Sequence, residues 1–321
     1  MQNFLQEQTT DASQVLHTVS SIMSAPIALT AVSCHIIESL QLVMTYQTQI
    51  LTFTTADNER LHGALFTPPD RQSDLALLLV HGVAMNFYLP PLPTIGQALA
   101  DRGHHCFVIN TRGHDWISRA GNLTKFGGAA YETFEDSAKD LDGALEFLST
   151  RGYKRFILVG HSLGCVKSLL YQGSRQRADV VGVVSCSCPR QFYSARAEEQ
   201  PEFKELMARA EEMVAQDKGE EFLWAWTSGA MGIFTARTYV NKYGPHEIND
   251  VRPHAGRLGC PYLAIAGGAE HPYFPRYAKE LAEAGGASAS CKIVPGANHF
   301  YTNHEPEVVE IIADWLKQFT N

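Results

Sequence analysis

A serine between two glycines near the middle of the chain has the surroundings of a catalytic nucleophile. Ser162 is the centre of the segment GHSLG at 160–164, which follows the apolar run FILV at 156–159. The run predicts a buried strand, and residues 165–172 predict a helix. A tight turn between such elements holds a serine hydroxyl out at the edge of a sheet, and adjacent glycines avoid backbone collisions. Because the segment also fits an ordinary turn, the interpretation depends on a base, an acid and an oxyanion site elsewhere.

The candidate general base is a histidine near the end of the sequence. A serine hydroxyl is a weak nucleophile at neutral pH and needs a neutral imidazole that accepts its proton. His299 lies in the segment PGANHF at 295–300, between a predicted strand at 291–294 and the last predicted helix. His304 stands at the start of that helix, where a solvated or capping role is more typical, and it is the alternative base.

The candidate acid follows the predicted strand that precedes the histidine segment. Glu270 ends the segment GGAE at 267–270, directly after the apolar run at 262–266. From a loop at the end of a strand, its carboxylate can accept a hydrogen bond from His299 Nδ1 and stabilise the imidazolium. Asp250 is the alternative acid, but it precedes the sequence VRP and is more typical of the start of a turn.

Two backbone N–H groups are candidates for an oxyanion hole, which must stabilise the negative charge of a tetrahedral intermediate. One is the N–H of Leu163, directly after the serine. The other is the N–H of Val83, in the segment HGV that follows a continuous apolar strand at 75–80. We expect His81 to have a structural role, as a hydrogen-bond partner of the nearby loop backbone.

The elements that would position these residues alternate between strands and helices. Residues 49–66 predict a β-hairpin, after which strands and helices follow one another. The predicted strands are 75–80, 106–110, 156–159, 180–184, 262–266 and 292–294, and the predicted helices are 94–102, 136–149, 165–172, 274–284 and 307–319. This alternation is typical of an α/β fold with a doubly wound, mostly parallel sheet. We expect one such domain over residues 49–321.

A long segment between the strands at 180–184 and 262–266 interrupts the alternation. It is far longer than a crossover needs, and we expect a helical cap, at about 190–255, inserted over the carboxyl ends of the strands. An aromatic stretch within it includes Trp224 and Trp226. These side chains either hold the cap together or, with Phe87 and Tyr88 after the HGV segment, line an apolar acyl pocket.

The amino-acid composition indicates which binding partners and which cellular compartment to expect. The formal net charge is −8 and no segment is rich in Lys or Arg, so we expect no nucleic-acid partner. The seven cysteines lie mostly in apolar or strand-like segments, which favours free thiols in a reducing cytoplasm. The pair Cys186 and Cys188 has no second pair of ligands nearby in the sequence, so we expect no metal site there.

The first 48 residues differ from the rest of the sequence. The first basic residue is Arg60, so a secretory signal or an organellar presequence is not expected. Apolar residues recur at helical spacing over 15–23 and 36–43, which predicts an N-terminal extension of two amphipathic helices over residues 1–48. Three partners fit their apolar faces: the chain's own domain, a second copy in a homodimer, or a membrane surface.

The order and spacing of the motifs resemble the α/β-hydrolase superfamily, and most of all its esterase and monoglyceride-lipase-like members. The matching segments are HG at 81–82, RGH at 112–114, GHSLG at 160–164, GGAE at 267–270 and NH at 298–299, within a span of about 49–319. Three residues depart from the family pattern. Glu270 stands where Asp is usual, Asn110 where many relatives carry Asp, and Asp115 where glycine is common.

These residues and the resemblance imply a serine hydrolase that cleaves an ester, a lactone or a thioester with an apolar acyl or alcohol group. Ser162 would attack the carbonyl, His299 would carry the proton, and Glu270 would orient His299. No metal or organic cofactor is expected. An acyltransferase or a cyclising thioesterase, which excludes water from the same acyl-enzyme, is one alternative. A non-catalytic ligand-binding or scaffold protein with this fold is the other.

Overall fold

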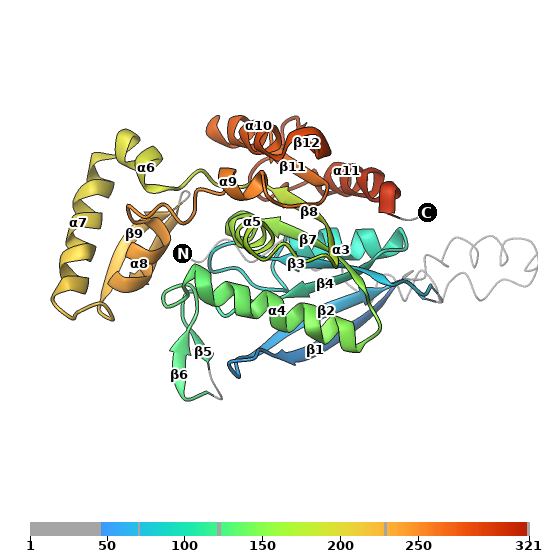
Figure 1. Cartoon of the computed structure of the whole chain (residues 1–321), viewed down its shortest axis with the longest axis horizontal. Helices are drawn as coiled ribbons and strands as arrows, with labels where there is room; N and C mark the ends of the chain where they lie inside the picture. Colours follow the sequence, from blue (N-terminus) through green and yellow to red (C-terminus); the bar gives the residue numbers. More distant parts are fainter. Residues whose placement is uncertain (1–45, 70, 121–122, 228–229, 320–321) are drawn as a thin grey trace, which may run out of the picture. The chain divides into compact units, whose positions relative to one another are not determined.

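The computed structural model describes residues 46–69, 71–120, 123–227 and 230–319 (Figure 1). The helical extension expected over residues 1–48 therefore lies outside the described residues, apart from its last three positions. Within these ranges, no helix is both long enough and apolar enough to cross a membrane.

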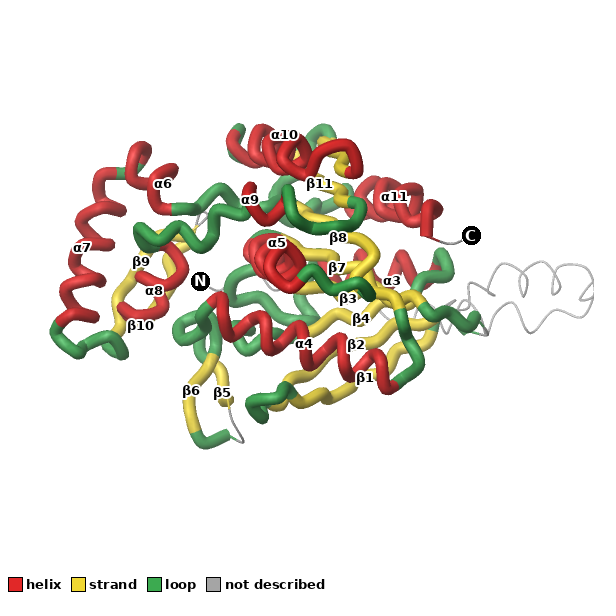
Figure 2. Tube along the Cα trace, viewed as in Figure 1, coloured by secondary structure: helices red, strands yellow, loops and turns green. Residues whose placement is uncertain are grey.

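The centre of the fold is an eight-stranded sheet with the strand order β1-β2-β4-β3-β7-β8-β11-β12 (Figure 2). Strand β2 runs antiparallel to β1 and β4, and the other neighbouring strands are parallel. This arrangement confirms the predicted α/β fold with a mostly parallel sheet. The strands are β1 (Gln47–Thr54), β2 (Arg60–Thr67), β3 (Leu75–Val80), β4 (His105–Ile109), β7 (Arg155–His161), β8 (Val180–Cys186), β11 (Tyr262–Gly267) and β12 (Ala289–Val294). A short hairpin of β5 (Ser118–Ala120) and β6 (Lys125–Gly127) lies outside this sheet.

Helices cover both faces of the sheet, as the sequence alternation predicts. One hydrophobic cluster joins the sheet to α4, α5 and α10, and a second joins its other face to α3 and α11. Strand β3 is continuously apolar because Leu78 and Val80 belong to the first cluster, whereas Leu77 and Leu79 belong to the second. These helices are α3 (Leu92–Asp101), α4 (Phe134–Thr150), α5 (Leu163–Arg175), α10 (Tyr273–Gly285) and α11 (Glu305–Leu316).

The segment between β8 and β11 forms a cap with its own hydrophobic core (Figure 1, left). It consists of α6 (Tyr193–Glu199), α7 (Pro201–Ala215), β9 (Phe222–Thr227), β10 (Ala230–Thr235) and α8 (Ala236–Tyr243), and the short α9 (Arg252–Ala255) leads back to the sheet. The predicted helical cap is therefore only partly helical, because its aromatic stretch forms an antiparallel two-stranded sheet. In β9, Leu223 and Ala225 are buried, whereas Trp224 and Trp226 are exposed, which is the two-residue period of a strand.

The candidate catalytic residues all follow the carboxyl ends of strands. Val83 follows β3, Ser162 follows β7, Glu270 follows β11 and His299 follows β12. Because these strands run parallel in one sheet, their carboxyl ends meet at the same edge. The cap borders this edge, since the Val83 side chain packs against both the main core and the cap core.

Candidate active site

Ser162 occupies a strained turn between β7 and α5. Its backbone has φ +53° and ψ −125°, a combination that few residues other than glycine adopt. Its N–H donates a hydrogen bond of 2.9 Å to the carbonyl oxygen of Cys186, which ties the turn to the end of β8. Strained backbone that neighbouring structure holds in place is concentrated at functional sites, where it presents a side chain in one direction.

The glycines around Ser162 are required by close backbone contacts. A Cβ on Gly164 would collide with the carbonyl oxygen of Val80 at the end of β3, and one on Gly160 would collide with that of Gly164. A Cβ on Gly82 would lie 2.9 Å from the Cβ of Ser162. The loop at 81–83 therefore lies directly against the serine.

The Gly164→Ala variant should lower the free energy of unfolding by about 3 kcal/mol, because the new methyl group meets a carbonyl oxygen that belongs to the central sheet. Urea unfolding followed by circular dichroism measures this change. Gly219→Ala is the matched control, since its added Cβ would meet only the flexible side chain of Arg237. Equal stability of both variants would contradict this account of the turn.

His299 and Glu270 form a hydrogen-bonded pair. His299 Nδ1 lies 2.6 Å from Glu270 Oε1. The Glu270 side chain is 1% exposed, whereas that of His299 is 22% exposed. A carboxylate in this position holds the proton of a neutral imidazole on Nδ1 and leaves the lone pair on Nε2. His299 Nε2 is thus free to accept a proton, as a general base requires.

The second carboxylate oxygen of Glu270 is also fully engaged. Oε2 accepts hydrogen bonds from the N–H of Gly267 at 2.6 Å and from the hydroxyl of Ser187 at 2.7 Å. The Tyr301 hydroxyl lies 2.7 Å from Ser187 Oγ. The bond to Gly267 explains how a glutamate fits at this position, because its longer side chain folds back onto the end of β11. The sequence pattern does not reveal this role of Ser187, since the two cysteines beside it suggest only a metal pair.

His161 brings the histidine loop beside the serine turn. Its Nε2 donates a hydrogen bond of 2.8 Å to the carbonyl oxygen of His299, and the two rings are 5.0 Å apart. Burial, and then the neighbouring ring of His299, lowers the pKa of His161 to about 3, so the His161 ring is neutral. Among the described residues, Ser162 Oγ makes no hydrogen bond with His299. A hydrogen bond between the Ser162 hydroxyl and the His299 ring is therefore part of the proposed mechanism and not an observed contact.

The loop at 81–83 is anchored by the ring of His81. Nδ1 of His81 donates to the carbonyl oxygen of Gly82 at 2.7 Å, and Nε2 accepts from the N–H of Thr111 at 3.0 Å. Burial, and then the charge of Lys167, lowers the pKa of His81 to about 3. In a planar trans peptide the C=O and N–H groups point in opposite directions, so this anchor also sets the direction of the Val83 N–H.

The two predicted oxyanion donors are available for a ligand. In the described part of the chain, neither the N–H of Val83 nor that of Leu163 donates a hydrogen bond. Leu163 is the first residue of α5, where the N–H groups of a helix have no partner within the helix. The helix dipole adds a partial positive charge at the same point.

Two departures from the family pattern have structural roles in the loop after 81–83. Asn110 Oδ1 accepts a hydrogen bond from the N–H of Phe87 at 2.8 Å. Asp115 Oδ1 accepts from Asn86 Nδ2 at 3.0 Å, and the other Asp115 oxygen lies 2.8 Å from His114 Nδ1. Asn110 and Asp115 therefore fix the loop that carries Phe87.

The alternative base and acid have other partners. Asp250 binds Arg252 through both carboxylate oxygens, with a shortest distance of 2.7 Å. His304 Nδ1 lies 3.4 Å from Glu307 Oε1, at the start of α11. The structure therefore brings neither of them into the hydrogen-bonded pair of His299.

The predicted pocket aromatics differ in their exposure. Phe87 is partly buried and packs against the core on the α3 face, with its ring 5.4 Å from that of Tyr88. Tyr88 is 60% exposed, and Trp224 and Trp226 are 64% and 60% exposed on the face of the β9–β10 sheet opposite Leu223 and Ala225. The structure therefore does not bring the four side chains together in one cluster of contacts.

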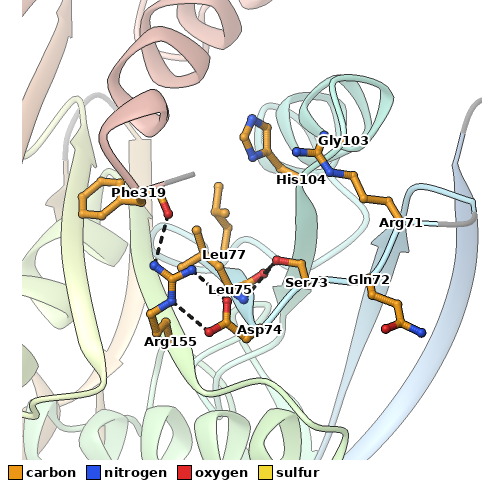
Figure 3. Close-up of a pocket in the computed structure, with 10 residues that line it drawn as sticks. All are labelled: Arg71, Gln72, Ser73, Asp74, Leu75, Leu77, Gly103, His104, Arg155 and Phe319. Carbon is orange, nitrogen blue, oxygen red and sulfur yellow. Dashed lines mark hydrogen bonds and ion pairs between the residues drawn. The ribbon is translucent and has the colours of Figure 1, made fainter. Parts of the chain in front are cut away.

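A separate pocket of about 240 Å³ lies at the opposite edge of the sheet (Figure 3). Its lining includes Leu75 and Arg155, the first residues of β3 and β7, so it is at the amino ends of these strands. The Arg155 guanidinium is already bound to Asp74 and to the carbonyl oxygen of Phe319. This pocket holds none of the candidate catalytic residues.

Solved structures with a similar fold include several esterases. The esterase domain of a Rhodothermus marinus protein is 19% identical, with a TM-score of 0.57 over 85% of this chain and 98% of that one. Est1E from Butyrivibrio proteoclasticus is 14% identical, with a TM-score of 0.61 over 85% and 99%. The Pyrococcus furiosus esterase Pf2001 is 18% identical, with a TM-score of 0.59 over 86% and 92%. At these identities the likeness concerns the fold.

Similarity of sequence assigns the chain to a protein family more directly than similarity of fold does. No curated protein sequence matches this one. A profile of the alpha/beta hydrolase family, however, matches residues 77–311, which is well over half of the chain and includes all the candidate catalytic residues. The chain therefore belongs to the alpha/beta hydrolase family.

Proposed function

We propose that this protein is a serine hydrolase that cleaves a carboxylic ester or a related acyl bond. The arrangement that supports this most strongly is the pair of His299 and Glu270, 2.6 Å apart, beside the strained turn of Ser162. The esterases with a similar fold support the same reaction class, and Est1E has been solved with ferulic acid bound. A small ester with an apolar or aromatic acyl group is the substrate class that we propose.

In the proposed mechanism, Ser162 Oγ attacks the carbonyl carbon while His299 Nε2 accepts its proton. The N–H groups of Val83 and Leu163 donate hydrogen bonds to the oxyanion. The intermediate collapses as the bond to the leaving alcohol breaks and His299 returns the proton to that alcohol. Water then attacks the acyl-enzyme and gives a proton to His299, which passes it to Ser162 as the carboxylic acid leaves. Glu270 holds His299 in the required tautomer throughout.

Stopped-flow cleavage of p-nitrophenyl acetate, butyrate and octanoate tests this function. We expect a burst of nitrophenolate equal to the protein concentration, followed by slower turnover, because the acyl-enzyme accumulates. Mass spectrometry of the products in water, with and without an added alcohol, separates a hydrolase from an acyltransferase. Release of nitrophenolate no faster than in buffer, for all three esters, would contradict the proposal.

The exposed tryptophans of the cap should contribute to binding of long acyl chains. Replacing Trp224 and Trp226 together by Ala should raise the KM for the octanoate ester about tenfold and leave that for the acetate ester unchanged, because only the long chain covers their rings. Steady-state kinetics with both esters measures the difference. Ile50→Ala, at a 64% exposed residue on β1, is the control. Equal effects on both esters would exclude the tryptophans from the acyl site.

A further inference from the structure

A cluster of three buried charged side chains joins the cap to the hydrolase core. Glu132 precedes α4, Lys167 lies on α5, and Lys242 lies on cap helix α8. Glu132 Oε1 lies 2.5 Å from Lys167 Nζ, and Glu132 Oε2 lies 2.9 Å from Lys242 Nζ. All three side chains are at most 1% exposed. The cap is therefore joined to the core by a buried ion pair between Lys242 and Glu132.

Burial shifts the pKa values of these side chains, which distinguishes the cluster from ion pairs on the protein surface. Burial by itself raises the pKa of Glu132, but the two ammonium groups more than reverse this and hold it well below its usual range. Burial lowers the pKa of Lys242, which Glu132 opposes. With two lysines and one glutamate, each carboxylate oxygen is committed to one ammonium group. Removing Lys242 would free one oxygen and leave a balanced pair of Glu132 and Lys167.

The cluster continues through Thr111 to the loop beside Ser162. The hydroxyl of Thr111 accepts a hydrogen bond of 2.8 Å from Lys167 Nζ and lies 3.3 Å from Glu132 Oε1. The same hydroxyl is 3.2 Å from His81 Nε2, the ring nitrogen that also accepts from the Thr111 N–H. Since His81 Nδ1 binds the carbonyl oxygen of Gly82, an unbroken chain of polar contacts runs from the cap to this peptide.

Both predicted oxyanion donors are attached to this chain. His81 fixes the peptide between Gly82 and Val83, and therefore the direction of the Val83 N–H. Lys167 lies on α5, the helix whose first residue is Leu163. A shift of Glu132 toward a single lysine would thus disturb the geometry of the two donors, which must match the oxyanion closely.

We propose that Lys242 is a positioning residue, through which the cap holds the oxyanion donors in place by way of Glu132, Lys167, Thr111 and His81. The inference rests on the proposed function, since it concerns the transition state of acyl transfer. Interactions that are realised mainly in the transition state change kcat rather than KM. Lys242 touches no reacting atom, so its effect must pass through the loop at 81–83.

The Lys242→Met variant of the full chain tests this role, because it keeps the length of the side chain and removes its charge. We expect kcat for p-nitrophenyl butyrate to fall about tenfold with KM within twofold of wild type, since a misplaced donor costs less than a deleted one. The rate of Ser162 labelling by a fluorophosphonate, whose phosphonyl oxygen occupies the oxyanion site, should fall by the same factor.

Asn241→Ala is the matched control for loosening of the cap. Asn241 is the neighbour of Lys242 on α8, and it also joins the core, through the N–H of Phe134 at 3.2 Å and through Glu135 at 2.9 Å. Neither of these two hydrogen bonds involves Thr111 or His81. The control should keep kcat and the labelling rate of wild type. Equal losses in both variants would overturn the proposal, as would a folded Lys242→Met variant with unchanged kcat and labelling.

Thr111→Val provides an independent test if Lys242→Met does not fold. It removes the hydroxyl and keeps the backbone N–H that binds His81. We expect a loss of kcat without a change of KM. Where Lys242→Met does fold, the double variant should lose no more activity than the larger single variant, because both substitutions act through one chain of contacts. A fully active Thr111→Val variant would overturn the proposal. Lack of ester cleavage by the wild type would instead count against the proposed function.

Discussion

Ser162→Ala should lower kcat/KM for a chromogenic ester by a factor on the order of 10⁴ or more, because no acyl-enzyme can form without the hydroxyl. The effect should not come from unfolding. Ser162 makes its structural hydrogen bond to Cys186 through the backbone N–H, which alanine keeps. We therefore expect the variant to unfold at nearly the same urea concentration as the wild type.

Ser168→Ala is the matched control for this loss. Ser168 lies on α5, the helix that follows Ser162. It is fully buried, and its hydroxyl has no hydrogen-bond partner within the described residues. Its removal should leave both activity and stability close to those of the wild type. If Ser162→Ala kept most of the activity while folded, the serine would not be the nucleophile.

Glu270→Gln should lower kcat by a factor on the order of 10³ to 10⁴, because it forces the wrong tautomer on His299. The N–H of Gly267 and the hydroxyl of Ser187 both donate to Glu270 Oε2, so the amide oxygen of glutamine must take that place. The amide NH₂ then points at His299 Nδ1, which must become an acceptor. The proton moves to Nε2, where it blocks proton transfer from Ser162.

Two further variants separate this effect from a general loss of charge. Glu270→Asp keeps a carboxylate but shortens it by one methylene, so we expect partial activity. Asp250→Asn alters the alternative acid, which binds Arg252 in the structure, and it should retain nearly full activity. An active Glu270→Gln variant together with an inactive Asp250→Asn variant would reverse the assignment of the acid.

Most strands of the sheet could be predicted from the sequence pattern. The position of each candidate catalytic residue after the end of a strand could be predicted in the same way. Continuous apolar runs such as 75–80 predict strands that are buried on both faces, and the structure confirms this. The order of strands then brings Ser162, Glu270 and His299 to one edge, because parallel strands share the direction of their carboxyl ends.

Other features could not be derived from local patterns. Ser187 contributes through a hydrogen bond to a residue 83 positions away, which no local spacing encodes. A lysine on a helix normally indicates the solvent-exposed face. Lys242 of α8 is instead fully buried and forms an ion pair with Glu132. Trp224 and Trp226 alternate with Leu223 and Ala225, which is the period of a strand, although the cap as a whole was predicted to be helical.

The most direct test of the central claim is to find the site of covalent modification by a fluorophosphonate. Intact mass spectrometry of the full chain should show one phosphonyl adduct per protein, and peptide mapping should place it on Ser162, because the mechanism makes this hydroxyl the nucleophile. The Glu270→Gln variant should form the adduct far more slowly. A folded, ester-cleaving wild type with no adduct on Ser162 would contradict the account.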